Sequence, residues 1–265
     1  MQKRYIQIKK GQMHLYEIEA SVEERYKPLL CLHPAPYSGL FFKTIMPLLN
    51  KYRRIIAPDY PGYGGSYSLG ANPKIADYAD AINEGFMQND TQIQYDLIGF
   101  HTGCLVANEL SIINEQSVDK IIMIDIPYFN HKEQKKLYPQ MTNPLSISGD
   151  IESLQKTWDF NIKNRIDKVP IERSLELFIE NLKPGKNDYF AFHAAFTYKC
   201  EERFKSNPKH INVIATKSML LEATKIAAQT LNNSEIVNIH TITSNVFEEG
   251  AEVIAENVLS ILDVS

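Results

Sequence analysis

Between residues 29 and 125, short apolar segments with strand character alternate with longer segments in which apolar residues recur at helical spacing. The strand-like segments are 29–32, 54–57, 95–99 and 120–125, and the helix-like segments are 38–50, 73–88 and 103–114. Continuous apolar runs such as Leu29-Leu30-Cys31-Leu32 are typical of strands that are buried on both faces. Strands that alternate with helices predict a parallel, doubly wound sheet with right-handed crossovers.

The segments on either side extend this sheet. Residues 5–19 alternate apolar and polar side chains around Gly11, which predicts an antiparallel hairpin. Toward the C-terminus the alternation of strands and helices resumes. Strands are expected at 211–215 and 236–239, and helices at 220–231 and 247–262.

Residues 127–190 interrupt the alternation, because they contain no clear strand and carry helical stretches at 151–163 and 171–182. We therefore expect a helical cap at 127–190 on a core formed by 1–126 and 191–265. Aromatic side chains of this region should build the cap and in part line an apolar pocket for a small organic molecule. They are Phe129, Tyr138, Trp158, Phe160, Phe178, Tyr189, Phe190 and Phe192.

Charge and cysteine content exclude several classes of protein. The chain has 28 Lys and Arg against 32 Asp and Glu, a net charge of −4, so a nucleic-acid partner is not expected. Its 3 cysteines lack pairwise spacing, which favours a reducing compartment over a disulfide scaffold. No segment approaches the roughly 18 apolar residues of a transmembrane helix. We expect a cytoplasmic protein that does not bind membranes.

Three short motifs follow predicted strands. Residues 33–36 read His-Pro-Ala-Pro, residues 59–66 read Asp-Tyr-Pro-Gly-Tyr-Gly-Gly-Ser, and residues 99–103 read Gly-Phe-His-Thr-Gly between a strand and a helix. In this order and at these strand ends, they resemble the H-G-x-P, D-x-x-G-x-G-x-S and G-x-S-x-G motifs of the α/β-hydrolase superfamily. The resemblance covers nearly the whole chain and implies the α/β-hydrolase fold with a cap, although Pro34 replaces the glycine of the first motif.

The resemblance implies that residue 101 stands where the family carries its nucleophile, at a tight turn between strand and helix. Gly99 and Gly103 supply the small residues that such a turn needs, and its strained central residue costs about 1–3 kcal/mol. The central residue here is His101 rather than serine. Hydrolysis by a Ser-His-Asp triad is therefore not expected.

The other two triad positions also differ from the family's pattern. After the strand at 211–215, Ser218 or Met219 falls where the family carries its acid, with Glu222 a few residues later. Counting back from the closing helix, Ser244 falls where the family carries its histidine, and His240 lies four residues earlier.

Three roles are open for His101. A neutral imidazole could attack an acyl carbon, it could act as a general base, or it could fill a pocket without taking part in chemistry. Asp125 could orient the ring from the neighbouring strand, or it could cap the turn before Pro127. Ser244 could bond to the ring from the opposite side, as a Ser/His pair with exchanged positions.

The resemblance also implies groups that bind substrate. The backbone N–H groups of Thr102 and Ala35 would polarise a carbonyl group. His33 is expected to hold its loop by hydrogen bonds, and His193 to contact the core or the cap rather than to react. The histidines lack metal-ligand spacing, so no metal is expected, and no cofactor is implied.

Together these features favour a hydrolase-like enzyme that acts on a small acyl or carbonyl compound at a non-standard site centred on His101. The alternative is a catalytically inactive α/β-hydrolase-fold protein that binds a small molecule or a protein partner. A lyase or proton-transfer enzyme is a third, weaker reading, because one fold hosts many chemistries.

Overall fold

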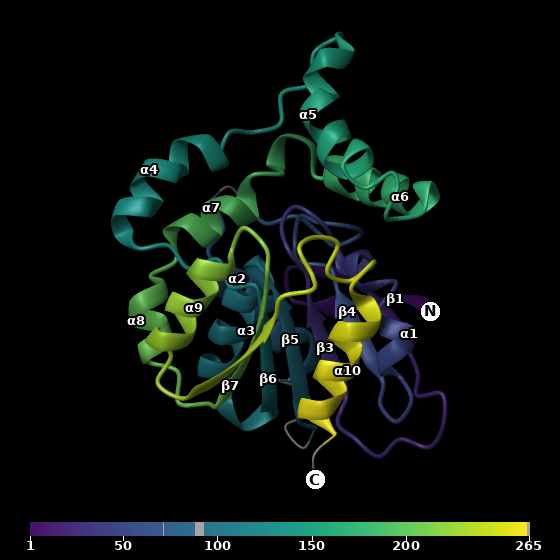
Figure 1. Ribbon diagram of the computed structural model, residues 1–265, viewed down its shortest axis with the longest axis vertical. Helices are drawn as coiled ribbons and strands as arrows, with labels where there is room; N and C mark the ends of the chain where they lie inside the picture. The colour runs from purple at the N-terminus through teal and green to yellow at the C-terminus, as the bar shows by residue number, and fades with distance from the viewer. Residues whose placement is uncertain (71, 88–92, 264–265) are drawn as a thin grey trace.

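The computed structural model describes residues 1–70, 72–87 and 93–263, and Figure 1 shows a sheet at its centre with helices on both faces. The sheet has eight strands in the order β1-β2-β4-β3-β5-β6-β7-β8. Their bounds are β1 Gln2–Ile8, β2 Gly11–Ile18, β3 Leu29–Leu32, β4 Ile55–Pro58, β5 Tyr95–Phe100, β6 Val118–Ile124, β7 Ile211–Thr216 and β8 Ser234–Ile239. β2 pairs antiparallel with β1 and β4, and every other pairing is parallel. The predicted hairpin and the doubly wound, mostly parallel sheet are confirmed.

Two hydrophobic cores lie on the two faces of this sheet. Along β3, Leu30 and Leu32 belong to one core, whereas Leu29 and Cys31 belong to the other. The first core includes side chains of α2 (Ile75–Phe86), α3 (Thr102–Ile113) and α9 (Leu221–Thr230), and the second includes those of α1 (Met46–Leu49) and α10 (Ala251–Leu262). Burial on both faces explains why the central strands β3 and β4 are continuously apolar.

The helix predicted at 38–50 is divided into a 3-10 helix at Gly39–Phe42 and the short α1. Pro47 lies at the start of α1, where its missing N–H does no harm, but within one long helix it would remove a hydrogen bond. The helix predicted at 73–88 ends at Phe86; residue 88 lies outside the described part of the chain.

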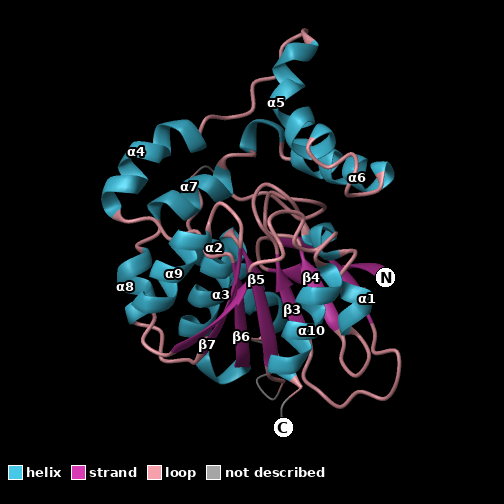
Figure 2. Ribbon diagram, in the orientation of Figure 1, coloured by secondary structure: helices cyan, strands magenta, loops and turns pink. Residues whose placement is uncertain are grey.

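The region between β6 and β7 is helical, as predicted. It contains α4 (His131–Met141), α5 (Gln155–Trp158), α6 (Ile171–Leu182), α7 (Phe190–Thr197) and α8 (Cys200–Lys205). A π-helical turn, Asp159–Lys163, follows α5. Figures 1 and 2 show α4, α5 and α6 above the end of the sheet at which β6 leads into them. This is the carboxyl edge of the parallel strands, where β5 also ends.

α6 places polar residues toward the rest of the molecule and apolar residues toward solvent. Its buried side chains are Arg173, Ser174, Leu177 and Glu180, whereas Ile171, Leu175 and Ile179 are 47%, 44% and 49% exposed. This distribution is the reverse of that in most helices at the surface of a globular protein.

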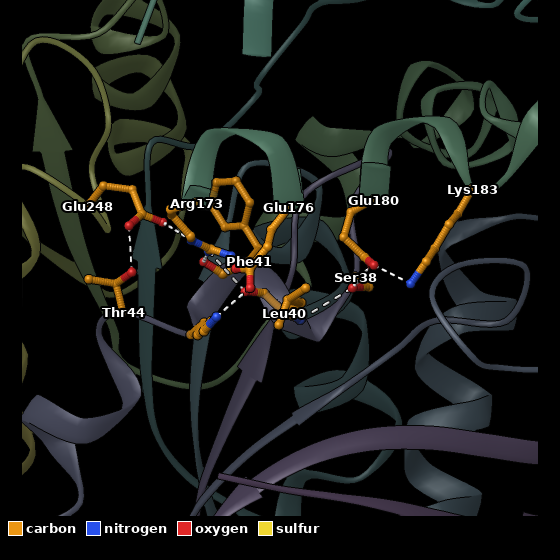
Figure 3. A network of polar contacts seen from close by, with 10 residues as sticks. Ser38, Leu40, Phe41, Thr44, Arg173, Glu176, Glu180, Lys183 and Glu248 are labelled. Carbon is orange, nitrogen blue, oxygen red and sulfur yellow. Dashed lines mark hydrogen bonds and ion pairs between the residues drawn. The ribbon is translucent and has the colours of Figure 1, made fainter. Parts of the chain in front are cut away.

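Hydrogen bonds and ion pairs attach α6 to the core, as Figure 3 shows. The Arg173 guanidinium donates to the carbonyl oxygens of Leu40 (3.0 Å) and Phe41 (3.1 Å) and pairs with Glu248 (2.9 Å). Further along α6, the Glu180 carboxylate accepts from the Ser38 hydroxyl and the Lys183 ammonium.

Two general features of the described chain complete the fold. No helix in the described ranges combines the length and the apolar character needed to cross a bilayer. Cys31, Cys104 and Cys200 are free and buried.

We expect Arg173→Leu to lower the free energy of unfolding by about 3 kcal/mol, because it leaves a nearly buried carboxylate and two carbonyl groups without their donor. Chemical denaturation of the full chain measures this change. Lys205→Leu is the matched control, since it breaks an ion pair with Glu201 that lies on the surface. Equal stability of both variants would contradict a structural role for Arg173.

Candidate functional site

His101 is the single residue between β5 and α3. Its backbone angles are φ 49° and ψ −119°, a region that is costly for a residue with a side chain. Two hydrogen bonds hold it there. The His101 N–H donates to Ile124 O at 3.2 Å, and the His101 carbonyl accepts from Cys104 N–H at 2.8 Å.

Close backbone contacts make the flanking glycines necessary. A Cβ atom at Gly99 would lie 2.5 Å from the carbonyl oxygen of Gly103, and one at Gly103 would lie 1.9 Å from the carbonyl oxygen of Leu32. The first turn of α3 therefore packs directly on the end of β3. This contact also brings the start of α3 next to the loop that follows β3, at residues 33–36.

We expect Gly103→Ala to destabilise the protein by at least about 2 kcal/mol, because a backbone oxygen must move to admit the methyl group. Gly149→Ala is the matched control, since no atom lies within 4 Å of its Cβ position. Thermal and chemical unfolding of the two variants provide the comparison. A Gly103→Ala protein as stable as the control would show that the contact can relax.

The His101 side chain is partly buried. It stacks on the Phe100 ring at 4.0 Å between centroids and 24° between planes. Removal from water lowers the pKa of its imidazole to about 4. Within the described chain, no residue is hydrogen-bonded to the ring. The imidazole is therefore uncharged at neutral pH and has no carboxylate to orient it.

Asp125 is fully buried, and its carboxylate is directed to β7. It accepts hydrogen bonds from the Thr216 backbone N–H at 2.8 Å and from the Thr216 hydroxyl at 2.6 Å. Burial raises its pKa, against the opposing effect of hydrogen bonds from Thr216 and Ser218. Because the ends of β6 and β7 are adjacent, Thr216 reaches Asp125. Each oxygen of the Asp125 carboxylate accepts one hydrogen bond from Thr216. Among the described residues, Asp125 accepts no hydrogen bond from the His101 ring, which is the contact that the sequence had suggested.

Ser244 is exposed and lies in the loop between β8 and α10. Its hydroxyl accepts from the Asn245 side chain at 3.5 Å. In the described part of the chain, no hydrogen bond joins Ser244 to His101, which is the pair that the sequence had suggested. Phe247 is the residue of this loop that approaches the turn. Its ring meets the Phe100 ring edge-on, at 4.9 Å between centroids.

The two backbone N–H groups expected to bind a carbonyl oxygen are available. Neither the Thr102 N–H nor the Ala35 N–H donates to another described residue. Thr102 is the first residue of α3, where N–H groups lack partners within the helix and favour negative charge.

His33 holds the loop after β3. Its Nε2 atom accepts from the Tyr60 N–H at 3.0 Å, so Nδ1 carries the proton and donates to Pro34 O at 3.0 Å. The ring stacks on Tyr60 at 3.9 Å, and burial lowers its pKa to about 4. Both ring nitrogens of His33 are thus occupied by protein contacts.

His193 connects two helices of the region after β6. Its Nδ1 atom lies 2.7 Å from the Tyr138 hydroxyl, which joins α7 to α4. Partial burial lowers its pKa. No contact joins His193 to His101 in the described chain.

Asp59 has a structural role that the sequence did not reveal. Its carboxylate accepts from the N–H groups of Gly39 and Gly65, each at 2.8 Å, and lies 2.8 Å from Nδ1 of His14. These bonds join the loops after β3 and β4 to the hairpin. The Asp-containing motif pointed to the loop, but nothing in the sequence pointed to His14, which lies 45 residues earlier.

A cleft of about 350 Å³ lies between α6 and the core and is lined by both acidic and basic side chains. They include Lys43, Lys168, Glu172, Arg173, Glu176, Glu248 and Glu249. A second, more enclosed cavity of about 20 Å³ lies beside Phe41 and Phe247. Within the described ranges, His, Cys, Asp and Glu form no group of three or more that could hold a metal ion.

Comparison with known proteins gives matches by structure alone. No protein-family model matches the chain, and no curated protein does. An esterase from Exiguobacterium antarcticum superposes with a TM-score of 0.79 at 16% identity, covering 99% of this chain and 100% of the esterase. The enol-lactonase from Burkholderia xenovorans LB400 superposes with a TM-score of 0.79 at 11% identity, covering 98% of this chain and 100% of the lactonase.

Bromoperoxidase from Bacillus anthracis is also similar, with a TM-score of 0.78 at 15% identity over 99% of this chain and 100% of that one. At such low identity these matches concern the arrangement of the backbone. The mostly parallel eight-stranded sheet, its flanking helices and these superpositions together show that the chain has the α/β-hydrolase fold.

Proposed function

We propose that this chain is a hydrolase-like enzyme that acts on a small acyl or carbonyl compound at His101. The observation that carries the proposal is the uncharged imidazole at the strained turn between β5 and α3. The free N–H groups of Thr102 and Ala35 support it, because such donors can stabilise a developing oxyanion. The esterase and the lactonase with the same fold make ester chemistry the natural first test.

As a nucleophile, the unprotonated ring nitrogen of His101 would attack the acyl carbon of an ester. The bond to the alcohol oxygen then breaks, and the departing alkoxide takes the proton from the other ring nitrogen, directly or through water, so that the alcohol leaves and a neutral acyl-imidazole remains. Water hydrolyses the resulting acyl-imidazole, which releases the acid and restores His101. As a general base, the ring would instead take a proton from the attacking water.

The low pKa of His101 affects its roles as a nucleophile and as a general base. It keeps the lone pair available at neutral pH but makes the imidazole a weaker base. Asp125 does not compensate the charge that develops on the ring, so the rate should be modest beside that of an enzyme with a full triad.

We further propose that residues 127–190 form a cap over the site and that 1–126 and 191–265 form the catalytic core. The contacts of Arg173 and Glu180 with the loop at 38–41 support this division. Buried Ala191 and Ala194 in α7 also support it, because they belong to the core beside the sheet. The ligand would then lie between the cap and the carboxyl end of β5.

We expect the wild type to hydrolyse short acyl esters and His101→Ala to lose this activity by at least about a hundredfold, the usual size of an acid–base or nucleophilic contribution. Spectrophotometric assay of p-nitrophenyl acetate is sufficient. His210→Ala, an exposed histidine bonded to Asn233, is the control and should retain full activity. Equal rates for the wild type and His101→Ala would exclude catalysis by His101.

The pH dependence tests the state of the ring. The reactive form of His101 is neutral and its pKa is about 4. Protonation below this value should remove activity, so kcat/KM should rise with pH through about 4 and stay level through neutral pH. A rise in kcat/KM centred near the ordinary histidine pKa, about 6.5, would instead show that water solvates the ring and that its pKa is not lowered.

The second candidate function is binding without chemistry. It is favoured by the positions of Asp125 and Ser244, neither of which supports His101. Under this function a small ligand would stabilise the wild type against heat, and no acyl ester would be turned over. Ester hydrolysis that depends on His101 would exclude this second function.

A further inference from the structure

Arg165 lines the small cavity between the helical region and the core. The other lining residues are Phe41, Leu177, Asn245, Val246, Phe247 and Glu248. Phe41 follows the loop after β3, and Phe247 belongs to the loop after β8. Arg165 therefore reaches the place where the cap region meets two loops at the carboxyl side of the sheet.

The guanidinium of Arg165 has few acceptors. The chain has 7 arginines, and five of them pair with a carboxylate. These are Arg4, Arg53, Arg54, Arg173 and Arg203. Arg165 instead donates to the Asn161 side-chain oxygen at 3.3 Å and lies 5.5 Å from the centroid of the Phe160 ring. Arg165 also interacts with the buried Tyr37 hydroxyl, through both a side-chain hydrogen bond and its positive charge, and both oppose the rise in the pKa of Tyr37 that burial causes.

The acidic residue in the wall of this cavity does not neutralise Arg165. Glu248 is engaged by the Arg173 guanidinium at 2.9 Å and by the hydroxyl of Thr44 at 2.5 Å. The remaining lining is apolar apart from the Asn245 side chain. A guanidinium with five N–H donors that lies over an aromatic ring, and that has no carboxylate partner among the described residues, favours an anionic oxygen ligand.

Aromatic rings connect this cavity to His101. Phe41 stacks on Phe100 at 5.6 Å, and Phe100 stacks in turn on His101 at 4.0 Å. Phe247 meets the edges of both Phe41 and Phe100. The rings that wall the cavity are thus continuous with the ring on which His101 rests.

We infer that Arg165 binds a carboxylate of the substrate and that the substrate is a small acyl compound carrying this negative charge. The inference rests on the proposed function of His101 and adds the class of compound. The substrate would place its carboxylate against Arg165 and its acyl carbon at His101. The cavity of about 20 Å³ has room for about one water molecule. A carboxylate therefore enters only if the residues that line this cavity move apart.

Binding of a compound that resists hydrolysis tests this inference separately from catalysis. Succinamate carries one carboxylate and one amide carbonyl, and succinamide is its neutral counterpart. Isothermal titration calorimetry on the full chain should show that the wild type binds succinamate and prefers it to succinamide by about tenfold or more, as expected for a charge-assisted, bidentate contact. This preference should weaken as salt is added.

Two substitutions and one control isolate the guanidinium. Arg165→Gln should weaken succinamate binding by about tenfold or more and leave succinamide unaffected, whereas Arg165→Lys should retain part of the preference. Arg25→Gln is the control, because Arg25 also lacks a carboxylate partner but lies on the surface against the Tyr52 ring. If Arg165→Gln does not fold, the partial loss in Arg165→Lys provides the test.

The outcomes separate the two proposals. Equal succinamate affinity in the wild type and Arg165→Gln would overturn the inference, and so would a wild type that prefers succinamide or binds neither compound at millimolar concentration. Binding that depends on Arg165, without turnover of any ester, would support the anion site while excluding the proposed catalysis at His101.

Discussion

The contact of Gly103 with the carbonyl oxygen of Leu32 is the constraint on which the candidate site depends. It fixes the distance between the first turn of α3 and the end of β3, and no residue with a Cβ atom fits there. His101 is consequently held at a positive φ, and the Thr102 N–H, beside the loop at 33–36, donates to none of the residues that the structure describes. The strain at His101 persists because the sheet and both cores hold its two ends.

Acidic groups around this site are used mainly to hold loops in place. Hydrogen bonds to Asp59 join the loops after β3 and β4 to the hairpin, and those to Asp125 join the ends of β6 and β7. Glu180 and Glu248 perform a similar task between α6 and the core. Removal from water lowers the pKa of the His101 imidazole, and no carboxylate in the described part of the chain opposes this effect.

Much of the fold could be predicted because its central strands are buried on two faces and alternate with helices up to β6. The turn at His101 could also be located, since Gly99 and Gly103 mark it on both sides. The contacts of Asp125 and Ser244 could not, because a sequence does not show in which direction a side chain leaves a strand end or a loop. The pairing of Asp59 with His14 escaped for a related reason. His14 lies within an ordinary alternating strand, and only the folded sheet brings it next to that carboxylate.

The polar underside of α6 has a thermodynamic consequence. Separating this helix from the core would expose charged and hydroxyl groups, which water solvates well. It would expose little buried apolar surface to solvent. Such an opening would change the heat capacity only slightly and would respond weakly to denaturant, since both quantities follow the area of newly hydrated surface. Separation of α6 from the core would therefore leave little trace in the heat capacity of the protein.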